Sequence, residues 1–391
     1  MYIKVVFSQK SIIEIERSLF EKLFHNNPGN EDGIYSEAIN KLRISFTDLK
    51  NVATKYEVPY SLFFAPSPMI DIQIKEYEKI ILDKLPSKKS GEIFFYSRSK
   101  KLDLDIKRNI PLIVKDISRK QTLLKNMNPT ATKMLFTYHK NLSDKARYIV
   151  KLFQINLKEI KSKETALRYL ISKIEDHDIF VSVSSYNYMP QRILKNVEFS
   201  GFYIKDNYFP FIFINTKDDP ASESNIMETE GRQILTLVYL LCSIYENNHS
   251  GKKRVTNNFL YDLAGEILLP YIELKNYKIS TYSDLILVSD IYKITPSFLL
   301  ERIKKTIDKG LFILLRDEII KNRKNKTSIG RSIKGDTSKQ FLKYNGQHFS
   351  EIIVKNYISN NIAESQAKNI LFRKKKVTKK TWDSYCKRLN L

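Results

Sequence analysis

The stretch ILTLVYLLCSIYE, residues 234–246, is the most apolar segment of the chain and decides the fold. Its apolar residues are not confined to one stripe, because they occur on every side of the helix that its length predicts. A helix of this kind is buried on all sides in a protein core or lies in a membrane. A membrane span needs roughly 20 apolar residues, and this run is shorter. The stretch therefore predicts a helix at the centre of a protein core.

The segments on both sides of this stretch predict a small sheet and further helices. Upstream, DIFVSVSS (178–185), VEFSGFYIKD (197–206) and YFPFIFINTK (208–217) are rich in β-branched and aromatic residues and predict strands. Downstream, a helix is predicted at 255–269 and two helices within 283–310, separated by a turn at 293–295. These two helices have the spacing of a helix-turn-helix, although a plain helical hairpin of the core explains them equally well.

The N-terminal part of the chain predicts a small helical domain. Residues 10–24 and 35–43 have helical spacing, and NNPGNEDG (26–33) is a turn cluster. In SFTDLKNVATKY (45–56), Phe46, Leu49, Val52, Ala53 and Tyr56 share one helical face, with Ser45 placed to cap the helix. Helical patterns continue within 71–90 and 106–175.

The sequence therefore predicts an α+β fold that is mostly helical, divided into five ranges. These are a repressor-like helical head at 1–70, a helical connector at 71–177, a core with a short sheet at 178–320, a basic linker at 321–344 and a basic helical C-terminal region at 345–391.

Charge and cysteine content bear on partners and location. The chain has 66 Lys and Arg against 43 Asp and Glu, a net charge of +23. So basic a surface attracts polyanions, above all nucleic acid, although an AT-rich genome also raises the lysine content. The two cysteines form no disulfide framework, and the N-terminus is too polar for a signal peptide. We expect a cytoplasmic protein without a membrane partner.

Two basic regions are the predicted nucleic-acid contacts. The first comprises Lys321, Arg323, Lys324, Lys326, Arg331 and Lys334, and the second comprises Arg373, Lys374, Lys375, Lys376, Lys379 and Lys380. A shorter basic run lies at 252–254. Such segments suit phosphate contacts, which position a duplex without reading its sequence, but a solvated surface run would have the same composition. The head is acidic at Glu31 and Asp32 and poor in Arg and Gln, so dimerisation or partner docking explains it as well as base recognition does.

The order of these segments resembles the ImmA/IrrE family of metallopeptidase-like regulators, in its long form with a repressor-like head. The segments that carry the resemblance are DLKNVATKYEVPYSLFFAPSP (48–68), GFYIKDNYFPFIFINTKD (201–218), which includes Asn215, RQILTLVYLLCSIYE (232–246), NNFLYDLAGEILLP (257–270) and GQHFSEIIVKNYISNNIAESQAKNIL (346–371). The third of these segments, RQILTLVYLLCSIYE, stands where the family has the sequence R-F-T-L-A-H-E-L-G-H. The resemblance implies a zincin-like core in a regulator of the kind that accompanies mobile elements, defence loci and toxin–antitoxin pairs.

The metal-binding residues of that family are replaced in this chain. A zinc site of the H-E-x-x-H type needs two histidines one helical turn apart, a glutamate beside the first, and a third ligand from a later helix. Matching Thr236-Leu237 to the family's T-L places Tyr239 at the first histidine, Leu240 at the glutamate and Ser243 at the second histidine, within Tyr-Leu-Leu-Cys-Ser. The window for the third ligand offers Asn257, Asn258, Phe259 and Leu260.

No other residues supply an alternative catalytic or metal site in the sequence. No two of the five histidines lie within five residues of each other, so no helix presents a pair; they are His25, His139, His177, His249 and His348. The carboxylates in IEDHDI (174–179) are interpreted as a polar turn. A buried, unpaired His or Glu costs roughly a few kcal/mol, so a site without metal is stable when apolar side chains fill it. We expect a pseudo-peptidase with no metal, no cofactor and no enzymatic activity.

Two functions are consistent with this sequence. The first is a DNA-binding regulator, associated with transcription, mobile elements or defence, in which the inactive core is a scaffold or sensor. The second is a protein-binding antitoxin, inhibitor or complex subunit that uses the filled cleft or the connector as an interface, alone or as an oligomer. An antitoxin can be both. A third, weaker alternative is a zinc metallopeptidase with an unrecognised site.

Overall fold

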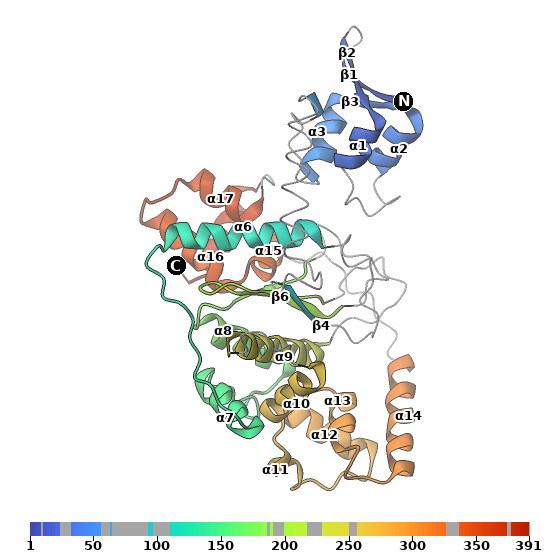
Figure 1. The fold of residues 1–391 in the computed structure, drawn as a ribbon, viewed down its shortest axis with the longest axis vertical. Helices are drawn as coiled ribbons and strands as arrows, with labels where there is room; N and C mark the ends of the chain where they lie inside the picture. The colour runs from blue at the N-terminus through green and yellow to red at the C-terminus, as the bar shows by residue number, and fades with distance from the viewer. Residues whose placement is uncertain are drawn as a thin grey trace. The chain divides into compact units, whose positions relative to one another are not determined.

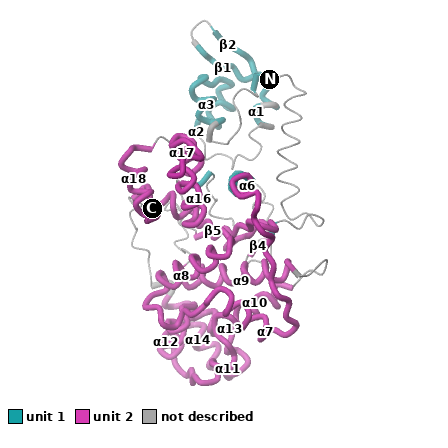
Figure 2. The backbone as a smooth tube through the Cα atoms, turned by 90° about the vertical axis from the view of Figure 1, so that its left-hand side faces the viewer, with its two compact units in different colours: residues 1–93, 99–123, 189–198 teal, residues 94–98, 124–188, 199–391 magenta. Residues whose placement is uncertain are grey.

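The computed structural model describes residues 1–8, 11–23, 33–55, 63–64, 93–96, 110–185, 188–190, 199–216, 229–249, 256–325, 336–373 and 377–390. The chain forms two compact units, which Figure 2 draws in teal and magenta. The first comprises residues 1–93, 99–123 and 189–198, and the second comprises residues 94–98, 124–188 and 199–391. The helix predicted within 71–90 lies outside the described residues. The five predicted ranges do not coincide with these two units, because the connector range 71–177 contributes residues to both.

The first unit contains a three-stranded sheet as well as helices. Its elements are β1 (Tyr2–Ser8), β2 (Ser11–Glu16), α1 (Arg17–Leu23), α2 (Gly33–Lys41), β3 (Arg43–Ser45) and α3 (Phe46–Lys55). The strand order is β2-β1-β3, with β1 antiparallel to β2 and parallel to β3. The predicted helix at 45–56 is confirmed as α3, because Ser45 Oγ accepts a hydrogen bond from the Asp48 amide at 3.0 Å and Leu49 and Val52 are buried.

The prediction that residues 10–24 are helical is wrong for residues 11–16, which form β2. The sequence SIIEIE alternates Ile13 and Ile15 with Glu14 and Glu16, the period of a strand that is half-buried. In the pairing with β1, Ile15 stands opposite Ile3 in the core. The backbone of β2 is hydrogen-bonded to β1. This pairing outweighs the helical spacing of apolar residues that is present over residues 10–24 as a whole. The first unit is therefore not purely helical.

The second unit is built on a four-stranded sheet with the order β4-β6-β7-β5. The strands are β4 (Ile93–Tyr96), β5 (Phe180–Val183), β6 (Gly201–Ile204) and β7 (Phe211–Ile214). β6 and β7 form an antiparallel hairpin, and β5 runs parallel to β7. The three strands predicted after residue 178 are confirmed. The strand β4 was not predicted, because its segment lies in the range interpreted as a helical connector.

Both faces of this sheet are buried, which explains why β7 is apolar throughout and why every residue of β5, including Ser182, is buried. One face, with Val181 and Ile212, packs in a common core with α8 (Lys163–Glu175) and α9 (Glu230–His249). On the other face, Phe180 stacks on His348 with ring centroids 5.2 Å apart, and Phe211 meets Phe349 at 6.3 Å. These two partners belong to α16 (Gln347–Ile358), which follows α15 (Thr337–Asn345). Figure 1 shows the sheet between these two pairs of helices.

The remaining helices confirm a fold that is α+β and mostly helical. They are α6 (Pro111–Met127), α7 (Leu142–Leu152), α10 (Asn257–Leu268), α11 (Tyr271–Leu274), α12 (Tyr282–Ile291), α13 (Pro296–Ile303), α14 (Lys309–Asn325), α17 (Glu364–Phe372) and α18 (Lys379–Arg388). Among the described helices, none combines the length and the apolar character that a bilayer crossing requires.

Two predicted ranges differ from the structure. The helices α7 and α8, predicted in the connector, belong to the second unit and pack against α10 and α9. The predicted basic linker at 321–344 is helical at both ends, since α14 continues through residue 325 and α15 begins at residue 337. α15 is held in place by its N-cap, where Asp336 accepts a hydrogen bond from the Ser338 amide at 2.9 Å, and by the buried side chain of Phe341.

Candidate functional site

The helix α9, which contains the opening stretch, is buried throughout its central part. Every residue from 234 to 246 is buried. Its approach to the sheet is close because β6 begins with Gly201, where a Cβ atom would lie 2.6 Å from the Phe213 carbonyl oxygen and about 3 Å from side-chain atoms of Thr236 and Leu240. The helix is thus enclosed by the sheet on one side and by α8 and α10 on others.

The residues that the resemblance aligns with a zinc site do not fit a zinc ion. Tyr239 packs its ring against Tyr96 of β4, with centroids 4.2 Å apart, and its hydroxyl donates a hydrogen bond to Asn257 Oδ1 at 3.3 Å. Burial raises the pKa of the Tyr239 hydroxyl well above its usual value, so the group stays neutral. Leu240 is fully buried, and Ser243 Oγ donates to the Tyr239 carbonyl oxygen at 3.1 Å. Neither side chain offers an anionic or imidazole donor.

The third-ligand window contributes the partner of Tyr239. Asn257 is the first residue of α10, directly after the N-cap Thr256, whose side chain accepts from the Phe259 amide. The sequence therefore identified both residues of this hydrogen bond, although as positions where metal ligands are missing. Cys242, one turn away from Tyr239, is fully buried, and burial raises the pKa of its thiol. Across the described ranges, no group of three or more His, Cys, Asp or Glu residues is placed to hold a metal ion.

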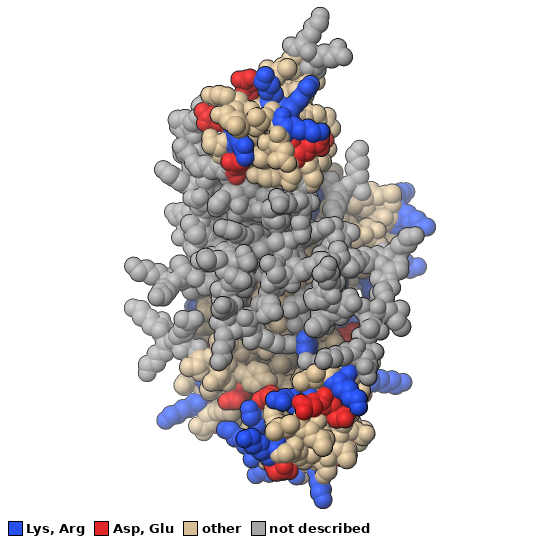
Figure 3. All heavy atoms as spheres, turned by 90° about the vertical axis from the view of Figure 1, so that its right-hand side faces the viewer, with Lys and Arg blue, Asp and Glu red and all other residues tan. Residues whose placement is uncertain are grey.

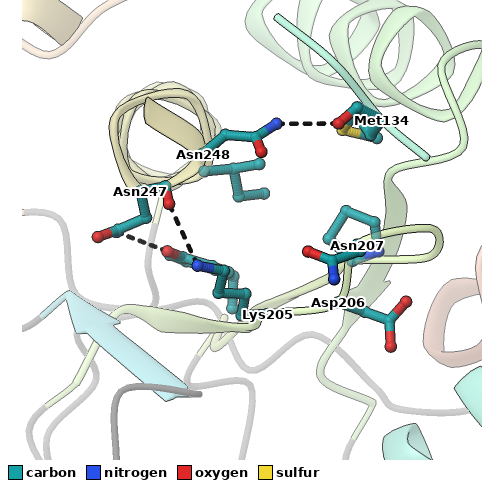
Figure 4. A pocket seen from close by; sticks show the side chains of 9 residues that line it. Met134, Lys205, Asp206, Asn207, Asn247 and Asn248 are labelled. Carbon is teal, nitrogen blue, oxygen red and sulfur yellow. Dashed lines mark hydrogen bonds between the residues drawn. The ribbon is translucent and has the colours of Figure 1, made fainter. Parts of the chain in front are cut away.

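A small polar pocket lies at the C-terminal end of α9 (Figure 4). Its volume of about 20 Å³ leaves room for a single water molecule. The polar groups around it already bond to one another: Asn247 Nδ2 donates to the Tyr203 hydroxyl at 2.7 Å, Lys205 Nζ donates to the Asn247 carbonyl oxygen at 3.2 Å, and Asn248 Nδ2 donates to the Met134 carbonyl oxygen at 3.2 Å. These contacts fix the end of α9 to β6, to the residue after it, and to Met134 in the segment before α7.

A larger pocket of about 180 Å³ lies beside the C-terminal end of α10. Aliphatic side chains and Pro270 form one part of its walls, and its polar end is formed by Lys158, Glu273 and Tyr292. Glu273 accepts a hydrogen bond from the Tyr292 hydroxyl at 2.6 Å and forms an ion pair with Lys158. The charges at the pocket therefore neutralise each other.

The helix pair α12–α13 has the backbone of a helix-turn-helix but not its exposed surface. In the turn, Lys293 adopts a left-handed conformation with φ of 59°, and the next residue, Ile294, is fully buried. In α13, Phe298 meets Tyr261 of α10 with ring centroids 5.3 Å apart, and buried Arg302 forms an ion pair with Glu266 at 3.2 Å. A recognition helix must present side chains to a DNA groove. Because α13 packs against α12 and α14 and contacts α10 through Phe298 and Arg302, the helical-hairpin interpretation of this pair is the one that fits.

The helix pair α16–α17 has a similar turn and an exposed second helix. The turn spans residues 359–363, in which Asn360 has φ of 58°. The inner side of α17 is buried through Ala367, Leu371 and Phe372. Its outer side carries Ser365, Gln366 and Asn369, all exposed. Figure 1 shows α17 on the outer side of α16, away from the sheet.

The helix α18 packs beside α17 and places two predicted contact residues there. Trp382 of α18 meets Phe372 of α17 with ring centroids 6.0 Å apart. Lys379 and Lys380, both exposed, form the first turn of α18 after the N-cap Thr378. The pKa of Glu364 lies below its usual value, mainly because Lys368 donates a hydrogen bond to its carboxylate. The positive charge of Lys379 makes a smaller contribution, so Lys379 lies near the start of α17.

The other predicted contact residues have different surroundings. Arg373 is the half-buried C-cap of α17, and burial lowers the pKa of its guanidinium to about 9. Lys321 is exposed on α14, and Arg323 and Lys324 lie in the last turn of the same helix. The structure therefore separates the first basic region, on α14, from the second, on α17 and α18. Outside the described residues lie 252–254, Lys326, Arg331, Lys334, Lys374, Lys375 and Lys376.

The charge around α15–α18 differs from that around α14. Residues 336–391 contain twelve Lys or Arg against four Asp or Glu. Two of the four acidic residues, Asp336 and Glu364, form ion pairs with Arg388 and Lys368. On the face that carries α14, by contrast, Figure 3 shows Lys and Arg interspersed with Asp and Glu, as in the neighbouring Arg316 and Asp317. In total, residues 336–391 carry eight more basic than acidic residues, and α14, which is shorter, carries three more (five Lys or Arg against two Asp or Glu).

Glu175, which joins these C-terminal helices to the core, was not predicted from the sequence as a structural contact. This residue lies in the segment interpreted as a polar turn, yet it is only 3% exposed. Its carboxylate accepts hydrogen bonds from the amides of Val181 and His348, both at 3.2 Å, so it caps the N-terminus of α16. Burial raises the pKa of Glu175 to about 7, although both hydrogen bonds oppose the shift. The one local signal was Gly346, whose φ of 85° and missing Cβ permit this close approach.

Comparison of the chain with known proteins gave no match to a protein-family model, to a curated protein or to a solved structure.

Proposed function

We propose that the chain is a DNA-binding regulator with a catalytically inactive, metallopeptidase-like core, and that it binds duplex DNA through the surface of α15–α18. The observation that carries this proposal is the threefold excess of basic over acidic residues between 336 and 391. Two of these basic residues, Lys379 and Lys380, are exposed in α18, which packs beside the exposed helix α17. Phosphate contacts from such lysines supply most of the affinity of non-specific DNA binding.

The shape of the surface favours DNA over double-stranded RNA. The major groove of B-form DNA is about 12 Å wide and admits an α-helix. The major groove of an A-form RNA helix is too deep and narrow for side chains to read. An exposed helix flanked by lysines, as α17 is flanked by Lys379, therefore fits the groove of a DNA duplex.

The core supplies a rigid support for this surface. Glu175 of α8 caps α16, and Phe180 and Phe211 of the sheet pack on its inner side. At the positions that the resemblance aligns with a zinc site, Tyr239 and Leu240 contribute packing, and the hydrogen bond from Tyr239 to Asn257 joins α9 to α10. In this proposal the resemblance to ImmA/IrrE proteins concerns the scaffold, and the retained activity is binding.

The test is the salt dependence of binding to a labelled duplex of about 30 base pairs. Affinity should fall steeply between about 50 and 200 mM salt, and the double substitution Lys379→Glu/Lys380→Glu should weaken binding and reduce the slope by about one unit per lost contact. The matched control is Lys275→Glu/Lys278→Glu, an equal charge change at exposed residues after α11, at the other end of the second unit (Figures 1 and 2). Failure of the wild-type chain to bind any duplex at about 50 mM salt would exclude the proposal.

A protein partner is a second candidate, favoured by exposed apolar residues near α14. Leu287 of α12 is 63% exposed, and Ile313 and Ile320 of α14 are 40% and 43% exposed. The two isoleucines are seven residues apart and so lie on the same side of α14. An antitoxin or complex subunit would use such a face. A protein encoded next to this chain should co-purify with the wild type and be lost with Ile313→Lys/Ile320→Lys; equal recovery with both would reject this face.

A further inference from the structure

We infer that α17 reads base edges in the major groove, so that binding is sequence-specific and its specificity resides in Ser365, Gln366 and Asn369. This inference rests on the proposed DNA binding and assigns a reading helix to it. Phosphate contacts alone position a duplex and carry no sequence information, so a regulator needs a second set of contacts.

The composition of the outer side of α17 suits base recognition. Asn and Gln amides donate and accept in the pattern that adenine presents in the major groove, and a Ser hydroxyl suits several bases. Ser365 and Asn369 are four residues apart, hence one above the other on the helix, and Gln366 lies beside them. The Oε1 atom of Gln366 accepts a hydrogen bond from the Ala363 amide at 2.9 Å, which orients the amide group and leaves its Nε2 as a donor.

The position of these residues along the helix also agrees with a reading role. Recognition helices contact bases mainly through their N-terminal residues, and Ser365 and Gln366 lie in the first turn of α17. The only acidic residue of that turn, Glu364, is paired with Lys368 and lies near Lys379. Its negative charge is therefore offset where the phosphates would approach.

No other described helix of the second unit combines these properties with a helix-turn-helix connection. In α13, the second helix of the pair α12–α13, Phe298, Leu299 and Leu300 are buried, and the one exposed residue is Glu301. The helix α14 has an exposed side of mixed charge and apolar residues, with Asp317 beside Arg316. Amide and hydroxyl side chains in a row, beside exposed lysines, distinguish α17.

The inference is tested by selection from a pool of duplexes with a randomised central segment. The full-length wild type, Ser365→Ala/Asn369→Ala, Lys379→Glu/Lys380→Glu and the control Asn276→Ala/Ser283→Ala are each used to retain DNA over several rounds at about 100 mM salt. Gln366 is left intact because it also caps the helix. Circular dichroism melts establish that each variant is folded, which is expected because the substituted residues are exposed.

The wild type and the control should enrich the same short motif. The Ser365→Ala/Asn369→Ala variant should retain the pool with an unchanged salt slope but prefer that motif over random duplex at least about tenfold less than the wild type does. The Lys379→Glu/Lys380→Glu variant should retain less DNA of every sequence. A wild type that retains the pool without enriching a motif, or an Ala variant that enriches the wild-type motif equally, would overturn the inference and leave the proposed DNA binding intact. A wild type that retains no DNA would overturn both.

Discussion

The two helix pairs α12–α13 and α16–α17 have similar connections and opposite surroundings. Each has a short turn with one residue in the left-handed region, Lys293 with φ of 59° and Asn360 with φ of 58°. The second helix of the first pair packs against α12 and α14, and its Arg302 is paired to Glu266 of α10. The second helix of the other pair presents Ser365 and Asn369 to solvent. The backbone of a helix-turn-helix therefore does not identify a DNA-binding surface; exposure and side-chain chemistry decide.

The largest difference between α13 and α17 is expected in the free energy of unfolding of variants in the two helices. Leu299→Ala in α13 removes a fully buried side chain and should lower the free energy of unfolding by about 2–5 kcal/mol. Asn369→Ala in α17 changes an exposed residue and should alter it by no more than about 0.5 kcal/mol. Denaturant unfolding of both variants measures these changes. Equal effects at the two sites would show that α13 and α17 do not differ in packing as described.

A pH dependence of stability is expected from the Glu175 contact that supports α16–α17. Burial raises the folded-state pKa of Glu175 from 4.5 to about 7, so the folded state binds more protons than the unfolded state between these values. The free energy of unfolding should therefore fall as pH rises from about 4.5 to about 7, by no more than about 3 kcal/mol. Glu175→Gln should flatten this slope in denaturant titrations at several pH values.

The imidazole of His348 adds a pH dependence above its unfolded pKa of 6.5 and needs its own control. Burial lowers the pKa of His348, but the hydrogen bond to Asp178 and the charges of Glu175, Asp178 and Glu351 outweigh it, so the pKa is raised. A raised pKa stabilises the fold at low pH, and this contribution is lost as pH rises. His348→Gln should therefore reduce the loss of stability above about pH 6.5 and leave the slope below that pH unchanged. A steeper slope in Glu175→Gln than in the wild type would contradict the assigned burial.

The N-cap of α18 should have a smaller effect. Thr378 accepts a hydrogen bond from the Thr381 amide at 3.2 Å, and Lys379 and Lys380 follow it directly. Thr378→Ala should cost about 1 kcal/mol in the free energy of unfolding and should weaken DNA binding only slightly, because both lysines remain. The substitution Thr378→Ser should restore stability. Loss of DNA binding in Thr378→Ala as large as in Lys379→Glu/Lys380→Glu would assign the contact to the threonine.

The sequence allowed the locally determined parts of this comparison to be predicted. The turn at 293–295 and the helix cap at Ser45 depend on residues a few positions apart, and the strands β5–β7 depend on their own composition. The burial of α13 could not be predicted, because Glu266 precedes Arg302 by 36 residues. Likewise, Glu175 resembles a turn residue until the N-terminus of α16, more than 170 residues later, is placed on its carboxylate. Contacts between distant segments decide which side of a helix remains exposed.

The most direct test of the account is lysine footprinting of the full-length chain with and without a 30-base-pair duplex at about 50 mM salt. Acetylation of each lysine is quantified by mass spectrometry. The account predicts that Lys379 and Lys380 lose reactivity when DNA is added, whereas Lys304 and Lys305, exposed at the end of α13, keep theirs. Protection of Lys304 and Lys305 with unchanged Lys379 and Lys380 would contradict it.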